Sequence, residues 1–205
     1  MMMSSGIDPA GAISLAVREY QEHGNIAQLL ARLDSVGSAC EPEALIAAVE
    51  PYRDMPEVSG PIYERVVAAR PTDARALVIL ANAYWLSGRG PDVVGDLASR
   101  AIAADPSNRG GWHLWALTEP DLRARVARWQ QVTERFPSDD LALASLADNA
   151  ASLASTEDDD RARQLAIHCF ERLRERAQLP EQRDAVEQAL RVLGTRDAGC
   201  GMRKT

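Results

Sequence analysis

The stretch "DARALVILANAYWLSGRGPDVVGDLASRAIAADP", residues 73–106, decides the fold of the chain. Its first half carries the large residues Leu77 and Leu80 and the small residue Ala81, and this i, i+3, i+4 spacing places them on one helix face. Residues 87–92, "SGRGPD", then interrupt the pattern with glycine and proline. A second apolar helical periodicity follows the interruption. The stretch therefore predicts two amphipathic helices joined by a turn.

The same pattern recurs at prolines further along the chain. The residues six, nine and ten positions beyond Pro71, Pro106 and Pro137 are, in turn, Leu77, Leu80 and Ala81, then Trp112, Trp115 and Ala116, then Leu143, Leu146 and Ala147. Each proline is expected to stop the preceding helix. The residues after them, Thr72, Ser107 and Ser138, are expected to cap the next helix or to form the turn. A repeat of roughly 34 residues with loops of variable length follows from this spacing.

Helix pairs of this length, with a large-large-small face and a closing proline, resemble the tetratricopeptide repeat (TPR) family. In residues 73–106 the family's signature positions are occupied by Leu77, Leu80, Ala81, Tyr84, Gly88, Val94, Ala98, Ala101 and Pro106. The resemblance covers about residues 42–180 and is degenerate outside 73–106; Glu119, for example, stands where a tyrosine is usual. It implies an all-α, right-handed α-solenoid of antiparallel helix hairpins, whose first helices line a concave groove. One helix pair cannot bury its apolar stripe alone, so stacking is also expected on physical grounds.

The predicted organisation has five parts: a disordered N-terminus (1–7), a helical hairpin (8–40), TPR-like helix pairs (41–180), a C-terminal capping helix (181–194) and a flexible tail (195–205). Pro51 is expected to end or kink the helix that precedes it.

The charge and the cysteines exclude several classes of function. The net charge is −7, and residues 1–64 hold ten acidic and three basic residues, which leaves 20 of each for the remainder. Such a chain has no broad basic footprint, so neither nucleic-acid nor anionic-membrane binding is predicted. The three cysteines have no metal-site or disulfide spacing, and we find no signal-like or membrane-spanning run. These observations predict a cytoplasmic protein without metal or cofactor.

Several conspicuous residues receive structural interpretations. Trp112, Trp115 and Trp129 are expected in the core, whereas Trp85 is left open between packing and the groove. Adjacent helical residues project about 100° apart, so His168 and Cys169 do not form a nucleophile pair. Residues 157–160, "EDDD", are interpreted as a solvated loop that leads into a helix, since they lack the glycine and the glutamate of an EF-hand loop.

Polar contacts in a groove would come from positions on the first helices that lie off the core face. The candidates for ligand binding are Arg75, Asn82, Trp85, His113 and Asp148. Arg75 and Asn82 lie two helical turns apart on one face, a spacing that suits an extended peptide. The resemblance adds that peptide-binding family members often carry asparagine at the position of Asn82.

The leading functional hypothesis is a non-catalytic scaffold that binds a protein or peptide partner through its groove or by forming a homo-oligomer. One alternative is an accessory or regulatory subunit that docks on a basic partner through the acidic N-terminal helices. The other is a small helical enzyme with an unrecognised site. Catalytic carboxylate pairs, phosphate loops and nucleophile elbows are missing in recognisable form, so no catalytic residue is predicted.

Overall fold

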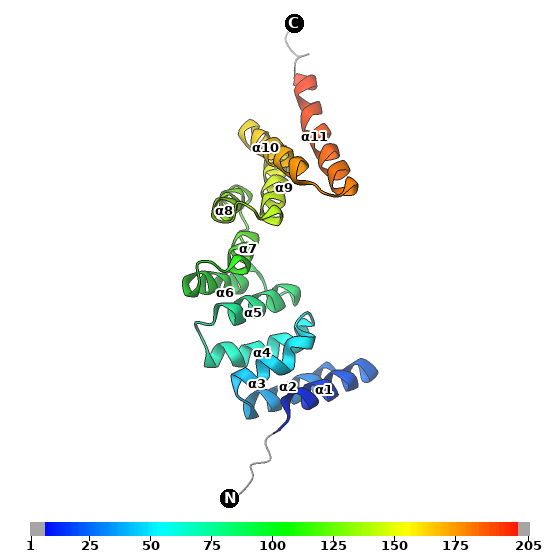
Figure 1. Cartoon of the computed structure of the whole chain (residues 1–205), viewed down its shortest axis with the longest axis vertical. Helices are drawn as coiled ribbons and strands as arrows, with labels where there is room; N and C mark the ends of the chain where they lie inside the picture. Colours follow the sequence, from blue (N-terminus) through cyan, green and yellow to red (C-terminus); the bar gives the residue numbers. More distant parts are fainter. Residues whose placement is uncertain (1–6, 201–205) are drawn as a thin grey trace, which may run out of the picture. The chain divides into compact units, whose positions relative to one another are not determined.

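The computed structural model describes residues 7–200, and for residues 195–200 it describes only the backbone. Every element in this range is a helix (Figure 1), which confirms the all-α prediction. The elements are α1 (Pro9–His23), α2 (Ile26–Ala39), α3 (Pro42–Val49), the 3-10 helix η1 (Glu50–Tyr52), α4 (Pro56–Ala69), α5 (Ala74–Leu86), α6 (Pro91–Ala104), α7 (Arg109–Leu117), α8 (Leu122–Arg135), α9 (Asp140–Glu157), α10 (Asp160–Arg176) and α11 (Pro180–Cys200).

The helices form two compact units. Unit 1 is Met1–Thr118 and unit 2 is Glu119–Thr205. The boundary falls between α7 and α8, beside Pro120. The repeat pattern places α7 and α8 in one helix pair within residues 41–180, so the pattern does not reveal this division.

The two predicted terminal segments are only partly described. Residues 1–6 and 201–205 lie outside the described residues. The last helix is expected from the sequence to end at Gly194, but α11 continues to Cys200, so residues 195–200 are helical rather than a tail. A single glycine costs a helix about 1 kcal/mol relative to alanine and does not by itself end it.

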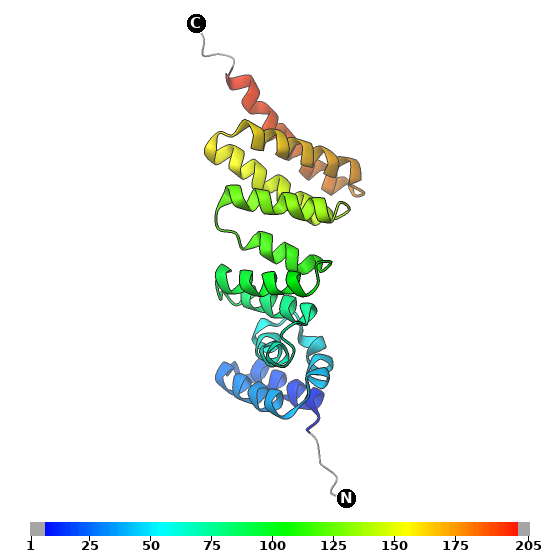
Figure 2. The same cartoon turned by 90° about the vertical axis from the view of Figure 1, so that its left-hand side faces the viewer.

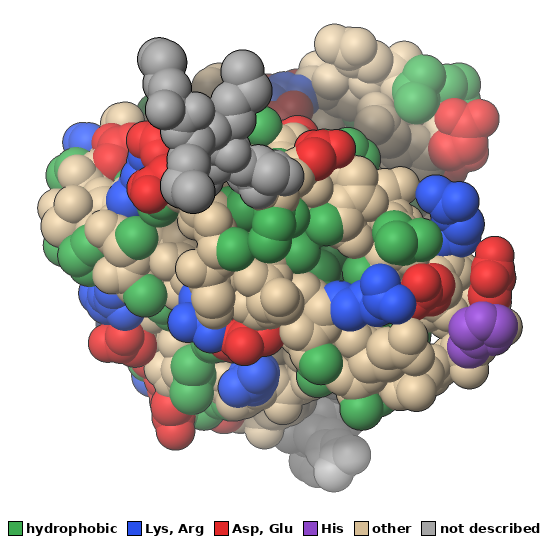
Figure 3. Space-filling model, turned by 90° about the horizontal axis from the view of Figure 1, so that it is seen from below, with side chains coloured by type: hydrophobic (Ala, Val, Ile, Leu, Met, Phe, Trp, Pro, Cys, Tyr) green, Lys and Arg blue, Asp and Glu red, His purple; other side chains and the backbone are tan. Residues whose placement is uncertain are grey.

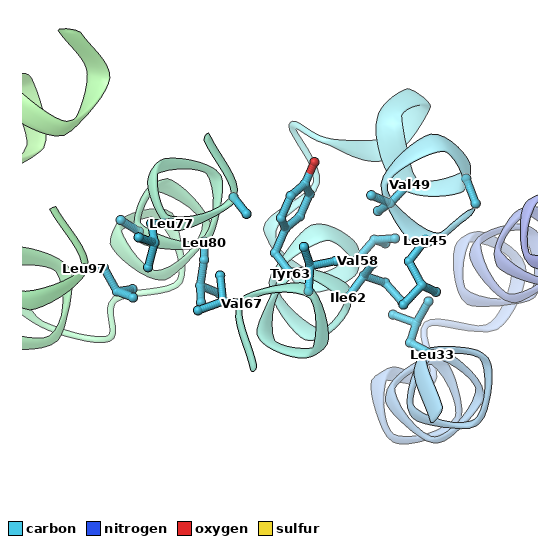
Figure 4. Packing of buried hydrophobic residues seen from close by; sticks show 14 of the residues in the cluster. Leu33, Leu45, Val49, Val58, Ile62, Tyr63, Val67, Leu77, Leu80 and Leu97 are labelled. Carbon is cyan, nitrogen blue, oxygen red and sulfur yellow. The ribbon is translucent and has the colours of Figure 1, made fainter. Parts of the chain in front are cut away.

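The core of unit 1 is continuous from α1 to α7. α4 packs against α2, α3 and α5, and α6 packs against α5 and α7. The predicted apolar face of α5 is buried, with Leu77 0%, Leu80 3% and Ala81 0% exposed. Figure 4 shows Leu77 and Leu80 beside Tyr63 and Val67 of α4. Successive helices thus share their buried faces, as the stacking argument requires.

Unit 2 repeats this packing with fewer helices. α9 packs against α8 and α10, and α10 packs against α11; α9 and α10 run side by side in both Figure 1 and Figure 2. Leu143, Leu146 and Ala147 are buried at the repeat positions. Trp129 on α8 is 3% exposed, which confirms its prediction as a core residue.

The same turn precedes α5, α7 and α9. In each copy the N–H of the residue before the helix donates to a carbonyl three residues earlier: Asp73 to Arg70 (3.1 Å), Asn108 to Asp105 (3.0 Å) and Asp139 to Phe136 (3.0 Å). The prolines occupy the second turn position, and the preceding helices end at Ala69, Ala104 and Arg135, which confirms that each proline follows a helix end.

The residues that cap α5, α7 and α9 lie one position after Thr72, Ser107 and Ser138, respectively. The side chains of Asp73, Asn108 and Asp139 accept hydrogen bonds from backbone N–H groups in the first helical turn. Thr72, Ser107 and Ser138 therefore form the turn and do not cap. The cap carboxylate or amide satisfies an N–H group that would otherwise lack a partner inside the helix.

Contrary to the prediction, neither Trp112 nor Trp115 is fully buried, although Trp115 packs against the edge of the core cluster. Both are half-buried; their rings meet edge to face with centroids 5.5 Å apart, and Trp112 Nε1 donates to the Pro106 carbonyl at 3.0 Å. Gly111 and Leu114 are buried in their place. α7 thus turns Gly111 and Leu114, rather than its tryptophans, most fully into the core.

The Gly110–Gly111 pair allows α7 to approach α5 and α6 closely. A Cβ built on Gly111 would lie 3.3 Å from both Ala101 Cβ and Ile102 Cγ1 of α6, and one on Gly110 would lie 2.8 Å from Val78 Cγ1 of α5. Gly111 and Leu114 therefore face the neighbouring helices, and the two tryptophans lie beside this contact. The glycines are close-packing residues as well as poor helix formers.

Gly111→Leu is expected to destabilise the protein by about 1–3 kcal/mol, because the added atoms overpack the contact with α6. Urea denaturation followed by circular dichroism measures the change. Gly194→Leu is the matched control, since nothing lies within 4 Å of the position that a Cβ would take on this residue of α11. Equal unfolding midpoints for the two variants would contradict the close packing of α7.

Candidate functional site

One exposed face of α5 carries three of the five predicted binding residues. Arg75, Val78, Asn82 and Trp85 recur at intervals of three and four residues, so they share a helix face away from Leu77 and its buried neighbours. The Arg75 side chain is 68% exposed, Asn82 is exposed, and Trp85 is 38% exposed, whereas Val78 is half-buried and packs against the core. We call these four residues the α5 surface. It combines a cation, an amide and two apolar side chains within three helical turns.

Charged residues of η1 and its following turn lie beside this surface. Arg75 Nη2 is 3.5 Å from Glu50 Oε1, and Arg53 Nη1 donates to the same oxygen at 3.0 Å. One carboxylate thus orients two guanidinium groups, each of which has further N–H donors. Sequence reasoning missed Glu50 and Arg53; the only available signal was a cluster of charged residues around Pro51, at the end of a predicted helix.

The hydroxyl of Tyr63 lies buried near these charges. Tyr63 is 1% exposed, and its hydroxyl has no hydrogen-bond partner within the part of the chain that the structure describes. Burial raises the pKa of this phenol, and the carboxylate of Glu50 raises it further. The hydroxyl therefore stays protonated, and Tyr63 acts as part of the core.

The other two predicted binding residues, His113 and Asp148, lie outside α5. His113 lies on α7, which packs against α5, but it is half-buried and already takes part in an interaction within the protein. Asp148 lies on α9 and belongs to unit 2. The structure therefore brings Arg75, Asn82 and Trp85 together, and it does not place Asp148 in the same unit.

Unit 2 has a groove of its own between α9, α10 and α11. Two adjoining cavities of about 590 Å³ and about 550 Å³ share Asp148, Phe170, Ala185 and Ala189 as lining residues. We call these cavities together the unit 2 groove. Sequence reasoning found Asp148 but missed the α11 side, because that helix was interpreted as a cap. The apolar residues of α11 at Ala185, Ala189 and Val192, with i, i+4, i+7 spacing, were the available signal.

A third cavity, of about 750 Å³, lies between α4, α5 and α6 in unit 1. Beside it, Tyr84 donates to Glu64 Oε1 at 2.7 Å, and the guanidinium of Arg89 lies 4.7 Å from the Tyr84 ring centroid. Burial and this hydrogen bond raise the pKa of Tyr84 to about 12. The Tyr84 side chain is thus held between two helices, and its phenol stays protonated at neutral pH.

The acidic N-terminal helices are partly neutralised by ion pairs. Arginines pair with carboxylates in this region as follows: Arg32 with Glu19, Arg65 with Asp34, Arg70 with Glu43, Arg75 with Glu50, and Arg89 with Glu64. Figure 3 shows basic and acidic side chains interspersed on the face that it presents. Most of these arginines follow residue 64 in sequence, so the acidic excess of residues 1–64 is smaller in the folded unit than along the chain.

The acidic loop before α10 and the buried cysteine of α10 have structural roles. Asp159 accepts from the N–H groups of Arg161 and Ala162 as the cap of α10, and these bonds together with Arg123 hold its pKa below the usual range. Cys169 is 1% exposed, and burial raises the pKa of its thiol, which disfavours the reactive thiolate. Within residues 7–194, no three His, Cys, Asp or Glu side chains are grouped so that they could hold a metal ion.

The described helices include no segment with the length and apolarity needed to cross a membrane.

The helix pairs, the shared core and the proline turns define the fold of a TPR-type helical-repeat protein. No protein-family model and no curated protein matches the sequence. Solved structures do match. A crystal structure of MamA aligns at a TM-score of 0.58 and 16% identity, over 78% of this chain and 96% of that chain. The thermophilic TPR protein TTC0263 of Thermus thermophilus aligns at 0.56 and 16%, over 89% and 98%.

YrrB, a TPR protein with an unusual peptide-binding site, aligns at a TM-score of 0.52 and 16% identity, over 77% of this chain and 84% of that chain. At these identities the likeness establishes the fold and no shared ligand. It confirms the TPR-like α-solenoid class expected from residues 73–106.

Proposed function

We propose that the protein is a non-catalytic scaffold that binds a protein or peptide partner through the α5 surface of unit 1. The observation that carries this proposal is the row of three exposed side chains, Arg75, Asn82 and Trp85, on one face of α5. The fourth member of the α5 surface, Val78, is half-buried and packs against the core. Arg75 pairs with Glu50, but no hydrogen bond or ring contact is found for the Asn82 and Trp85 side chains within the described residues.

The chemistry of the row suits a peptide in an extended conformation. An amide side chain both donates to and accepts from a peptide backbone, and a guanidinium binds carbonyl or carboxylate oxygens. Arg75 and Asn82 are about 10 Å apart along the helix axis, at 1.5 Å per residue, which is the reach of about three extended residues. Trp85 adds an apolar contact at one end. YrrB, with its peptide-binding site, supports the proposal by analogy of fold.

The ion pairs of unit 1 favour this surface over docking through the acidic N-terminal helices. Glu19, Asp34 and Glu43 already have arginine partners, so a basic partner would have to displace them. The predictions of a cytoplasmic location and of no nucleic-acid partner accompany the scaffold proposal.

The double variant Arg75→Glu, Asn82→Ala is expected to lose partner capture from native extract by at least about tenfold, since it reverses the charge and removes the amide. Affinity capture with quantitative mass spectrometry measures this loss, and circular dichroism checks that the helical content is unchanged.

The matched control is Arg161→Glu, Gln164→Ala on α10. Both of these residues are exposed, and the substitutions change charge and amide content in the same way. Unchanged capture by the α5 variant, or equal loss in the control, would reject the α5 surface as the binding site.

A further inference from the structure

Asp148 is the one charged side chain lining the unit 2 groove for which no ion pair is found among the described residues. The lining also includes Asp140, which pairs with Arg176 at 2.8 Å, and Arg163, which pairs with Asp160 at 3.0 Å. Asp148 lines both cavities, and no hydrogen bond or ion pair is found for it within the described residues. Asp148 is thus a solvent-exposed, unpaired carboxylate that lines both cavities.

The surroundings of Asp148 are largely apolar. Phe170 and alanines of α9 and α11 form the walls on both sides. Although the side chain is exposed, partial burial raises the pKa of the Asp148 carboxyl, with no neighbouring cation to lower it. A carboxylate placed against apolar walls gains more from a cation than one in open water does.

Exposed aliphatic side chains extend the groove in both directions. Leu141 of α9 lines one cavity and is 66% exposed, and Val192 of α11 lines the other and is 64% exposed. The lining on α9 runs from Asp140 to Ser155, which is about 20 Å of helix at 1.5 Å per residue. A surface of this length is longer than one side chain and fits a segment of several residues.

We propose that the unit 2 groove binds an aliphatic peptide segment that carries one lysine or arginine, with that cation on Asp148. The cation supplies the missing partner of the carboxylate, and the flanking aliphatic residues cover Leu141 and Val192. This site is a second one beside the α5 surface. It shares the scaffold role of the proposed function but does not require the α5 surface to bind.

The test uses three labelled amphipathic peptides that share one leucine–alanine sequence and differ only in a central Lys, Gln or Glu. Fluorescence anisotropy titrations measure their Kd values with the full chain. The Lys peptide is expected to bind about tenfold more tightly than the Gln peptide, and the Glu peptide more weakly than both.

Asp148→Asn should abolish the difference between the Lys and Gln peptides, and Asp148→Lys should make the Glu peptide the preferred ligand. Asp184→Asn is the control, because Asp184 is an exposed carboxylate of α11 outside both cavities. Circular dichroism verifies the fold of each variant. The Lys preference should persist in the Arg75→Glu, Asn82→Ala variant, so failure of the α5 surface and failure of this groove are told apart.

Three outcomes would overturn the proposal. The first is no measurable binding of any peptide, and the second is a Lys preference that survives Asp148→Asn. The third is a change of self-association on Asp148→Lys in sedimentation experiments, which would make a second copy of the chain the occupant.

Discussion

Tyr63→Ala is expected to lower the free energy of unfolding by about 3–5 kcal/mol, the range observed when a large buried aromatic side chain is truncated. Tyr63 is 1% exposed on α4, and Figure 4 shows it among Val58 and Ile62 of its own helix and Leu80 of α5. The cavity would open between two successive helices of the stack, α4 and α5. Urea denaturation followed by tryptophan fluorescence measures the loss, since Trp85, Trp112 and Trp115 all lie in unit 1.

Tyr63→Phe separates packing from the hydroxyl. The phenol oxygen is buried without a partner among the described residues, and such a group carries a desolvation cost. The phenylalanine variant is therefore expected to be as stable as the parent or up to about 1 kcal/mol more stable. A loss of more than that amount would mean that the hydroxyl has a stabilising partner, and it would contradict the geometry described for Tyr63.

The second large effect is expected for Trp129→Ala in unit 2. Trp129 is 3% exposed on α8, and its removal should cost about 3–5 kcal/mol. Trp129 is the only tryptophan after residue 118, so circular dichroism replaces fluorescence as the measurement.

Trp129→Phe keeps most of the buried ring and should recover most of the stability. Ala127→Ser, at an exposed position of the same helix, should change the free energy of unfolding by less than about 0.5 kcal/mol. If Trp129→Ala is no more destabilising than this control, then the indole does not belong to the core of unit 2.

Local features of the fold could be predicted because they depend on neighbouring residues. Pro71, Pro106 and Pro137 follow helix ends since proline lacks the N–H that a helix interior requires. The buried face of α5 follows from the spacing of its apolar residues alone. The sequence left Thr72, Ser107 and Ser138 open between capping and the turn, because each of them and the aspartate or asparagine after it are both chemically suitable caps. Only backbone geometry selects between them, and it places these three residues in the turn.

Features that depend on the distance between helices could not be predicted. The repeat register assigned Trp112 and Trp115 to the core, but Gly111 and Leu114 are the more buried residues of α7, and both tryptophans are only half-buried. The pairing of Arg75 with Glu50 joins residues 25 positions apart, and the unit 2 groove exists only once α11 lies against α10. The candidate site was therefore predicted in its α5 residues and missed in the partners that other helices supply.

The chain divides into its two units between α7 and α8. The boundaries of the sequence repeats, at the prolines, therefore do not coincide with the boundary between the units. A fragment cut at the repeat boundary, Pro106, would remove α7 and uncover the faces of α5 and α6 that Gly110 and Gly111 touch. A fragment cut after Thr118 keeps every helix of the first core. Anyone who dissects, permutes or fuses this protein should therefore count helices by what they pack against, and not by the prolines that punctuate the sequence.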